Sequence, residues 1–195
     1  DRLPEADALH VKLARAHGVH IVAASAPAAT RTRPVNRARL ITPTGQIGVQ
    51  DKQIMTRFEG EIWDVIPGNK LQVFDTVLGK IGILICYDSE FPLLGRALSE
   101  CDVICVPSVT ETLAGYWRVR IGTMARALEN QCMTAMSSVV GAAGWSDALG
   151  TSFGAGGIYC PPDRGFPDTG VLAAGVLNDP VWTCADVDLA QVAEV

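Results

Sequence analysis

The sequence has no apolar run that approaches the ~18 consecutive residues of a membrane-spanning helix, so a membrane protein is not expected. It also has no excess of basic residues: 16 Lys and Arg stand against 21 Asp and Glu, a net charge of −5. This mild acidity argues against nucleic acid or an anionic membrane as the main partner. No repeat and no linker interrupts the 195 residues, which predicts a single domain over residues 1–195.

Cysteine pairs and metal-ligand spacings are absent from the sequence as well. None of the six cysteines belongs to a C-x-x-C pair, so neither a zinc site nor a disulfide scaffold is expected, and a reducing, cytoplasmic compartment is favoured. His10 and His17 lie two helical turns apart, and no carboxylate repeats with them. We therefore predict no metal site and no cofactor.

The order of the predicted elements, with strands and helices alternating early and hairpins late, favours an α/β fold with sheets inside and helices outside. Helices are expected over residues 5–17, from the turn at Asp88 to about residue 100, and up to Asn130, the last with apolar residues at Trp117, Ile121, Met124 and Leu128. Residues 31–36, 107–115 and 141–157 are expected to be loops, and 53–70 irregular. Strands are expected over residues 19–25, 39–42, 46–50, 71–75, 79–85, 102–106, 132–140, 156–160, 171–176 and 182–187.

Cys86 lies where a buried strand over residues 79–85 gives way to a helix. Asp88 and Ser89 are of the type that caps a helix, and Pro92 is tolerated in a first helical turn. The partial positive charge of a helix N-terminus favours a thiolate, which makes Cys86 a candidate nucleophile. The turn alone leaves a second interpretation open, in which Cys86 is a small buried core residue.

Lys52 directly follows the second strand of a predicted hairpin over 39–50. A thiolate that attacks an amide needs a positive group where the oxyanion develops, and Lys52 is a candidate for that group. Taken alone, the position of Lys52 favours an ordinary solvated surface lysine over this role.

Four motifs follow one another along the chain: Lys52 with Glu61 and Pro67-Gly68, GILICYDSEFP over 82–92, VPS over 106–108, and RVR over 118–120 with ARALENQ over 125–131. In this order they resemble the nitrilase (carbon–nitrogen hydrolase) superfamily. The 86–92 sequence CYDSEFP is similar to one branch of it, in which an acetyltransferase-like domain is often fused. The resemblance implies a four-layer α-β-β-α sandwich of the nitrilase type.

The resemblance also implies roles for individual residues. Cys86 would be the nucleophile, and Lys52 would stabilise the tetrahedral oxyanion with the backbone N–H of Tyr87. Glu61 matches the supporting glutamate, and Glu59 is a weaker candidate because only Glu61 stands just ahead of a tryptophan. Thr110 and Glu111 match residues that line the substrate pocket.

The family's first glutamate, the general base, has no clear counterpart here. Leu3-Pro4-Glu5 mimics its motif, but Glu5 leads straight into a helix that should come later, so we interpret Glu5 as a helix N-terminal carboxylate. We accordingly expect a chain truncated at both ends. It would lack the family's first strand and helix, its general base, and its closing arginine-containing segment.

The resemblance thus implies a thiol-dependent hydrolase of non-peptide carbon–nitrogen bonds that acts through a cysteine thioester. It also implies a small amide as the substrate, with a nitrile or N-carbamoyl compound as further options, and a homodimer or higher oligomer as the assembly. The arginines at 118, 120 and 126, with Glu129, are expected to form a salt-bridged structural cluster. The alternative function is a catalytically impaired fragment or a non-catalytic binding module on the same scaffold.

Overall fold

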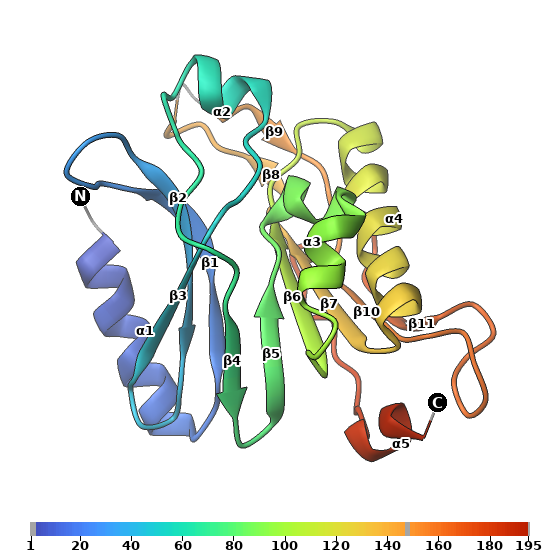
Figure 1. The fold of residues 1–195 in the computed structure, drawn as a ribbon. Coiled ribbons are helices and arrows are strands. Elements are labelled where there is room, and N and C mark those ends of the chain that lie inside the picture. Colours follow the sequence, from blue (N-terminus) through green and yellow to red (C-terminus); the bar gives the residue numbers. More distant parts are fainter. Residues whose placement is uncertain (1–2, 147–148, 195) are drawn as a thin grey trace. The chain divides into compact units, whose positions relative to one another are not determined.

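The computed structural model describes residues 3–146 and 149–194, and the chain forms two units, residues 1–72 and 73–195. Both units combine helices with β-sheets (Figure 1), so the predicted α/β fold is confirmed. Within the described residues, no helix has the length and apolar character that crossing a membrane requires.

The first unit is a three-stranded antiparallel sheet with one long helix packed on it. The strand order is β1-β2-β3, and Ala14 of the helix packs with Ala23 and Ile41 of the sheet. Gly18, whose φ of +64° suits glycine, follows the helix directly, as expected of a stop signal. The elements are α1 (Leu3–His17), β1 (Ile21–Ala28), β2 (Val35–Ile41), β3 (Ile47–Asp51) and a short α2 (Arg57–Glu61).

The predicted hairpin is confirmed, with Ile41 of β2 paired to Ile47 of β3. Its first strand begins earlier than expected, because Val35 already pairs with Ala28 of β1, so the predicted loop over 31–36 is too long. The second correction concerns residues 53–70, expected to be irregular, which contain α2. A capping box starts that helix: the Thr56 hydroxyl accepts from the Glu59 N–H, and the Glu59 carboxylate accepts from the Thr56 N–H.

The second unit is built on a six-stranded sheet in the order β11-β10-β7-β6-β5-β4. Its central strands β5, β6 and β7 are parallel, and the outer ones pair antiparallel. Figure 1 shows α3 and α4 beside this sheet. The strands are β4 (Val73–Thr76), β5 (Gly79–Ile83), β6 (Val103–Ser108), β7 (Met133–Ser138), β10 (Gly157–Tyr159) and β11 (Val171–Ala174). The helices are a 3-10 turn η1 (Cys86–Glu90), α3 (Pro92–Ala97), α4 (Leu113–Asn130) and α5 (Leu189–Ala193).

Two predicted segments of the second unit differ from the structure. The strand expected over 182–187 does not form: the sheet already ends at β11, and Trp182 is 94 % exposed rather than facing a core. The loop expected over 141–157 holds a small pair of strands, β8 (Gly141–Ala142) and β9 (Thr151–Ser152). Residues 147–148 of that predicted loop lie outside the described residues.

Helix α4 ends at Asn130, as the spacing of its apolar residues predicts, but the stripe that revealed it is largely solvent-facing. Trp117, Ile121 and Leu128 are 46, 62 and 52 % exposed. The face packed on the rest of the unit carries a second, less apolar set of residues instead: Tyr116, Val119, Gly122, Thr123, Arg126 and Ala127.

Candidate functional site

Cys86 stands at a strained turn that follows the core strand β5. Ile83, Leu84 and Ile85 are fully buried, and Cys86, half-buried, opens the 3-10 helix η1 with a φ of +51°. A left-handed backbone costs a residue with a Cβ about 1–2 kcal/mol, so contacts around the turn must hold it. Cys86 is thus more exposed than the buried run that precedes it, as a nucleophile that meets a substrate must be.

Asp88 and Ser89 supply part of that support, and they do so differently from the sequence prediction. The Ser89 hydroxyl donates to the Cys86 carbonyl oxygen at 2.7 Å, and the Asp88 carboxylate accepts from the Ile85 N–H at 3.3 Å. Both side chains therefore secure η1 rather than cap α3. Helix α3 begins at Pro92 and has Phe91, which carries no hydrogen-bonding side chain, at its N-cap.

Helix α4 holds the same turn from the other side. The Arg126 guanidinium donates to the Ser89 carbonyl oxygen at 3.0 Å and pairs with Glu129. A Cβ at Gly122 would lie 2.7 Å from that carbonyl oxygen, so only glycine allows the helix to come this close. Arg118 pairs with Glu90 of η1 at 2.5 Å. The expected structural cluster is thus present around these two arginines, and it fixes the turn that carries the cysteine.

The sulfur of Cys86 lies 3.5 Å from the carbonyl oxygen of Val109, just beyond the end of β6. The next residue, Thr110, exchanges hydrogen bonds with Phe153: its hydroxyl donates to the Phe153 carbonyl oxygen at 2.7 Å, and its own carbonyl oxygen accepts from the Phe153 N–H at 2.8 Å. Glu111 is exposed and accepts from the Gly150 N–H. The structure therefore brings the 109–111 segment to the cysteine, although Thr110 uses its hydroxyl internally.

Tyr87 follows the cysteine and packs edge-to-face on Phe91, with ring centroids 4.9 Å apart. The Arg118 guanidinium lies 5.5 Å from the centroid of the Tyr87 ring. These contacts hold the side chain of Tyr87 against Phe91 and against Arg118 of α4. Its role in the expected site rests on its backbone N–H.

Four of the remaining cysteines have raised pKa values, so they are expected to stay protonated and unreactive. Burial raises the pKa of Cys101, Cys105 and Cys132 to about 12, and also raises the pKa of Cys160. A thiol with a pKa near 12 has only about one ten-thousandth of its population as thiolate at pH 8. Cys184 is exposed, and Cys86 and Cys105 are both half-buried. Because burial of the Cys105 thiol raises its pKa to about 12, Cys86 and Cys184 are the cysteines that we expect to react with thiol reagents.

We therefore expect iodoacetamide at pH 8 to label native Cys184→Ser protein once, on Cys86, as measured by intact mass and peptide mapping. Denaturant should release all the remaining thiols for labelling. A native adduct on Cys101, Cys105 or Cys132 instead would contradict the burial that raises their pKa values.

Lys52 belongs to the first unit and directly follows β3. It is 2 % exposed, so it is not the solvated surface lysine that the sequence left open. Its Nζ donates to Glu59 Oε2 at 2.5 Å, forming a buried ion pair. Its backbone N–H donates to the Asn36 carbonyl oxygen at 2.8 Å. A buried ammonium on a fixed backbone has the properties of an oxyanion-stabilising group.

Glu59 is surrounded by donors. Oε2 accepts from Lys52, from the Thr56 N–H at 2.9 Å and from the Thr56 hydroxyl at 2.8 Å, and Oε1 accepts from the Asn36 amide at 2.9 Å. Burial alone would raise the pKa of Glu59, but the charge of Lys52 and these hydrogen bonds outweigh burial and lower it. Glu59 is thus held as a carboxylate whose acceptor sites are occupied.

The structure gives Lys52 a different partner from the one the sequence favoured. Glu61 is exposed at 62 % of its side chain and pairs with Arg57 one turn earlier on α2. Glu59 and Glu61 are two positions apart on α2, and side chains at positions i and i+2 of an α-helix point about 200° apart. The two carboxylates therefore cannot both face the lysine. The T-x-x-E signature of Thr56 and Glu59 was the sequence signal that could have marked the inward residue.

Among the described residues, no group of three or more His, Cys, Asp or Glu side chains is arranged to hold a metal ion. The chemistry available to the two groupings is that of a thiol and of an ammonium paired with a carboxylate. A thiol and an ammonium are each groups that acyl-transfer chemistry can use, the first as a nucleophile and the second as a stabiliser of negative charge.

The chain belongs to the carbon-nitrogen hydrolase family, whose sequence model matches residues 5–159. It is 35% identical to the "Probable hydrolase YhcX" of Bacillus subtilis over 93% of this chain and 36% of that protein. It is 31% identical to the "Deaminated glutathione amidase" of Yersinia enterocolitica over 67% of this chain and 50% of that protein. The chain therefore spans about a third to a half of the length of these relatives.

Solved structures share the fold at lower identity. The NitFhit protein of C. elegans matches with a TM-score of 0.82 at 21% identity, over 99% of this chain and 48% of that one. A carbon-nitrogen hydrolase from Helicobacter pylori G27 matches with a TM-score of 0.80 at 20% identity, over 99% and 70%. An amidase variant from Nesterenkonia sp. AN1, with the acetamide moiety of fluoroacetamide added covalently at its active site cysteine, matches with a TM-score of 0.76 at 20% identity, over 98% and 69%. The nitrilase-type fold expected from the sequence is confirmed.

Proposed function

We propose that this protein hydrolyses the carbon–nitrogen bond of a small amide, with Cys86 as the nucleophile. The observation that carries the proposal is the left-handed turn at Cys86, braced by η1 and α4, in a chain of the carbon-nitrogen hydrolase family. An amide is favoured over a nitrile because relatives named as amidases match 64–94% of the chain, whereas a relative named as a bifunctional nitrilase/nitrile hydratase matches 34% of it.

In the proposed reaction the Cys86 thiolate attacks the amide carbon and forms a tetrahedral oxyanion. Collapse of this intermediate breaks the carbon–nitrogen bond, and the amine or ammonia leaves with a proton. Water then cleaves the thioester to the carboxylic acid and regenerates the thiol. A general base must move these protons. Glu59 is unsuited to that task, because its pKa is lowered and its oxygens are occupied by Lys52, Thr56 and Asn36.

Lys52 and the Tyr87 N–H are proposed to stabilise the oxyanion, as the family resemblance implies. Glu59 takes the supporting role that the sequence assigned to Glu61, since it is the carboxylate that holds the ammonium of Lys52. Its hydrogen bonds orient the lysine before substrate arrives, so no reorganisation is needed as charge develops.

Thr110 and Glu111 are proposed to line the substrate site, because the 109–111 segment lies next to the Cys86 sulfur through Val109. The family match runs through the boundary between the two units, so we propose that both form one carbon–nitrogen hydrolase domain. A cytoplasmic location is proposed on the cysteine pattern of the sequence.

Self-association is proposed to use the exposed apolar stripe of α4, which contains Trp117, Ile121 and Leu128. A row of apolar side chains at helical spacing is of the kind that interfaces cover. The expected assembly is a homodimer or higher oligomer, which light scattering coupled to size-exclusion chromatography measures.

The test is to trap the acyl-enzyme. p-Nitrophenyl acetate releases p-nitrophenolate, a leaving group that needs no proton, so it reports on nucleophile and oxyanion stabilisation without the general base. We expect a burst of p-nitrophenolate and one acetyl group on the Cys86 peptide of Cys184→Ser protein, removable by hydroxylamine, and ammonia release from a panel of short amides. A chain that binds these amides but never acylates Cys86 would instead be a non-catalytic binding module.

A further inference from the structure

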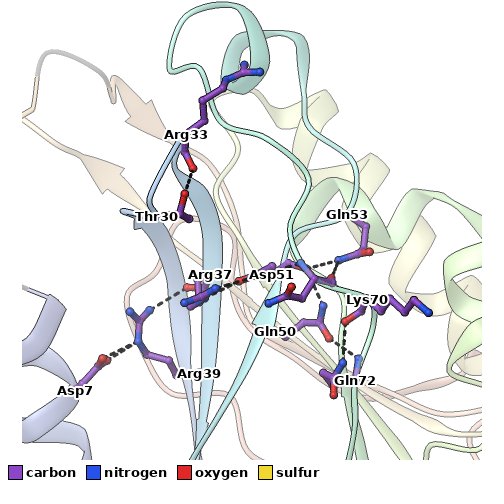
Figure 2. Close-up of polar contacts among 11 residues, drawn as sticks. Asp7, Thr30, Arg33, Arg37, Arg39, Gln50, Asp51, Gln53, Lys70 and Gln72 are labelled. Carbon is purple, nitrogen blue, oxygen red and sulfur yellow. Dashed lines mark hydrogen bonds and ion pairs between the residues drawn. The ribbon is translucent and has the colours of Figure 1, made fainter.

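Asp51, the last residue of β3, is a buried carboxylate with an ion-pair partner on the neighbouring strand. It is 2 % exposed, and Arg37 of β2 binds it through two nitrogens, with Nε 2.6 Å from Oδ1 and Nη2 3.0 Å from Oδ2. Figure 2 shows the Arg37 side chain reaching Asp51 at the end of the strand. Burial alone would raise the pKa of Asp51, but the hydrogen bonds from Arg37 and the Asn69 N–H and the nearby arginine charges lower it. Asp51 is therefore ionised and fixed.

The same carboxylate anchors the turn that contains Pro67 and Gly68. Oδ2 of Asp51 accepts from the Asn69 N–H at 3.1 Å. A Cβ at Gly68 would lie 2.1 Å from the Cβ of Asp51, so a glycine is required for the turn to sit against this side chain. From that position the Gly68 N–H donates to the carbonyl oxygen of Lys52 at 3.1 Å. The Pro67-Gly68 motif thus has a physical task, which is to hold the lysine's backbone.

The peptide groups on both sides of Lys52 are held by hydrogen bonds as well. The carbonyl oxygen of Asp51 accepts from the side-chain amides of Gln50 and Gln53, each at 2.7 Å. The Gln53 amide also donates to the Asn69 carbonyl oxygen at 2.6 Å, which ties the strand end to the turn. The Lys52 N–H donates to the Asn36 carbonyl oxygen, and the Lys52 carbonyl oxygen accepts from the Gly68 N–H. Both backbone polar groups of the lysine are therefore hydrogen-bonded.

A second arginine–carboxylate pair in the same unit offers a comparison, because its carboxylate lies on helix α1 rather than at the end of β3. Arg39 of β2 pairs with Asp7 of α1 at 2.7 Å and is 8 % exposed. This pair joins the helix to the sheet, and Arg39 also donates to the Arg37 carbonyl oxygen at 3.1 Å. Asp7 bonds the arginine, whereas Asp51 bonds both an arginine and the 67–69 turn. Buried ion pairs are weak evidence for stability, so the position of the Asp51 pair needs another explanation.

We propose that Asp51 is a positioning residue for Lys52. With Arg37 and the 67–69 turn, it sets the backbone from which the ammonium of Lys52 reaches the developing oxyanion. This rests on the proposed function, because Asp51 acts on the reaction only through the lysine.

The test is a double-mutant cycle on the rate of Cys86 acylation by p-nitrophenyl acetate. Asp51→Asn should lower the acylation rate constant by about 10- to 100-fold, since small displacements of a catalytic group carry losses of this size. The KM for the ester should stay nearly unchanged. In a Lys52→Met background, Asp51→Asn should have no further effect, because the group it positions is gone. Asp7→Asn is the matched control and should leave the acylation rate unchanged.

Gly68→Ala provides an independent arm if Asp51→Asn folds poorly. It displaces the turn from Asp51 without changing any charge, and it should reproduce the loss of acylation rate and the same dependence on Lys52. Equal, multiplicative losses in the wild-type and Lys52→Met backgrounds would show that Asp51 serves stability alone and would overturn the inference. A Lys52→Met variant with the wild-type acylation rate would overturn the proposed role of the lysine, and the inference with it, while Cys86 acylation would still stand.

Discussion

Cys86→Ala is expected to reduce amide hydrolysis by on the order of 10⁴-fold or more, because the covalent route has no other nucleophile. Alanine keeps the Cβ and meets the same left-handed backbone, so the turn should survive the change. The Ser89 and Asp88 hydrogen bonds use backbone atoms of the turn and remain available. The free energy of unfolding should therefore change by less than about 1 kcal/mol.

The measurement is ammonia release from the best amide of the panel, with thermal unfolding followed in parallel. Cys184→Ala is the matched control, since it removes an exposed thiol and should leave activity intact. Removal of a catalytic nucleophile costs several orders of magnitude in rate. If Cys86→Ala protein keeps activity within about tenfold of wild type, Cys86 is not the nucleophile.

Lys52→Met is expected to lower the acylation rate by about 100- to 1000-fold, the usual loss when one oxyanion donor is removed. Methionine is unbranched like lysine and only one heavy atom shorter, and it carries no charge. Because Glu59 then stays buried without its ammonium, the variant should also lose about 3–5 kcal/mol of unfolding free energy. A loss of activity in this variant alone could therefore reflect unfolding.

The double variant Lys52→Met/Glu59→Gln separates the two effects. Glutamine retains the capping box with Thr56 and leaves no buried charge unpaired. Most of the lost stability should return in denaturant titrations, while acylation stays as slow as in Lys52→Met. Glu61→Gln, on the exposed side of α2, should behave as wild type. Recovery of acylation together with stability in the double variant would argue that Lys52 serves folding only.

The Cys86 turn was accessible to sequence reasoning because its signals are local. A buried apolar run that stops at a cysteine, followed by Asp88, Ser89 and Pro92, describes a strand, a turn and a helix without reference to distant residues. What was missed is the detail of the capping: a 3-10 turn intervenes, and the polar side chains bind backward to the strand end. The positive φ angle at Cys86 could not be predicted from the sequence, because no residue type at or near the turn indicates it.

Helix α4 shows the limit of apolar periodicity. The spacing of Trp117, Ile121 and Leu128 correctly indicates a helix, yet the side packed on the sheet is the one with Gly122 and Arg126. Those residues pack there because η1 approaches closely enough to need a glycine and offers a carbonyl oxygen to an arginine. Neither requirement can be read from residues 113–130 alone.

Sequence patterns alone were enough to predict the family, the α/β class, the strand that leads to Cys86 and the candidacy of Lys52 as a functional residue. These predictions succeed because periodicity, turn residues and motifs involve residues that are close together in the sequence. Only the tertiary structure shows that Lys52 is buried and that Glu59, rather than Glu61, is its ion-pair partner. It likewise shows that Arg37, Asp51 and Gly68 lie close together beside the lysine's backbone. The reason is geometric: which face of a short helix turns inward, and which carboxylate an arginine on another strand can reach, depend on how separate segments pack against one another.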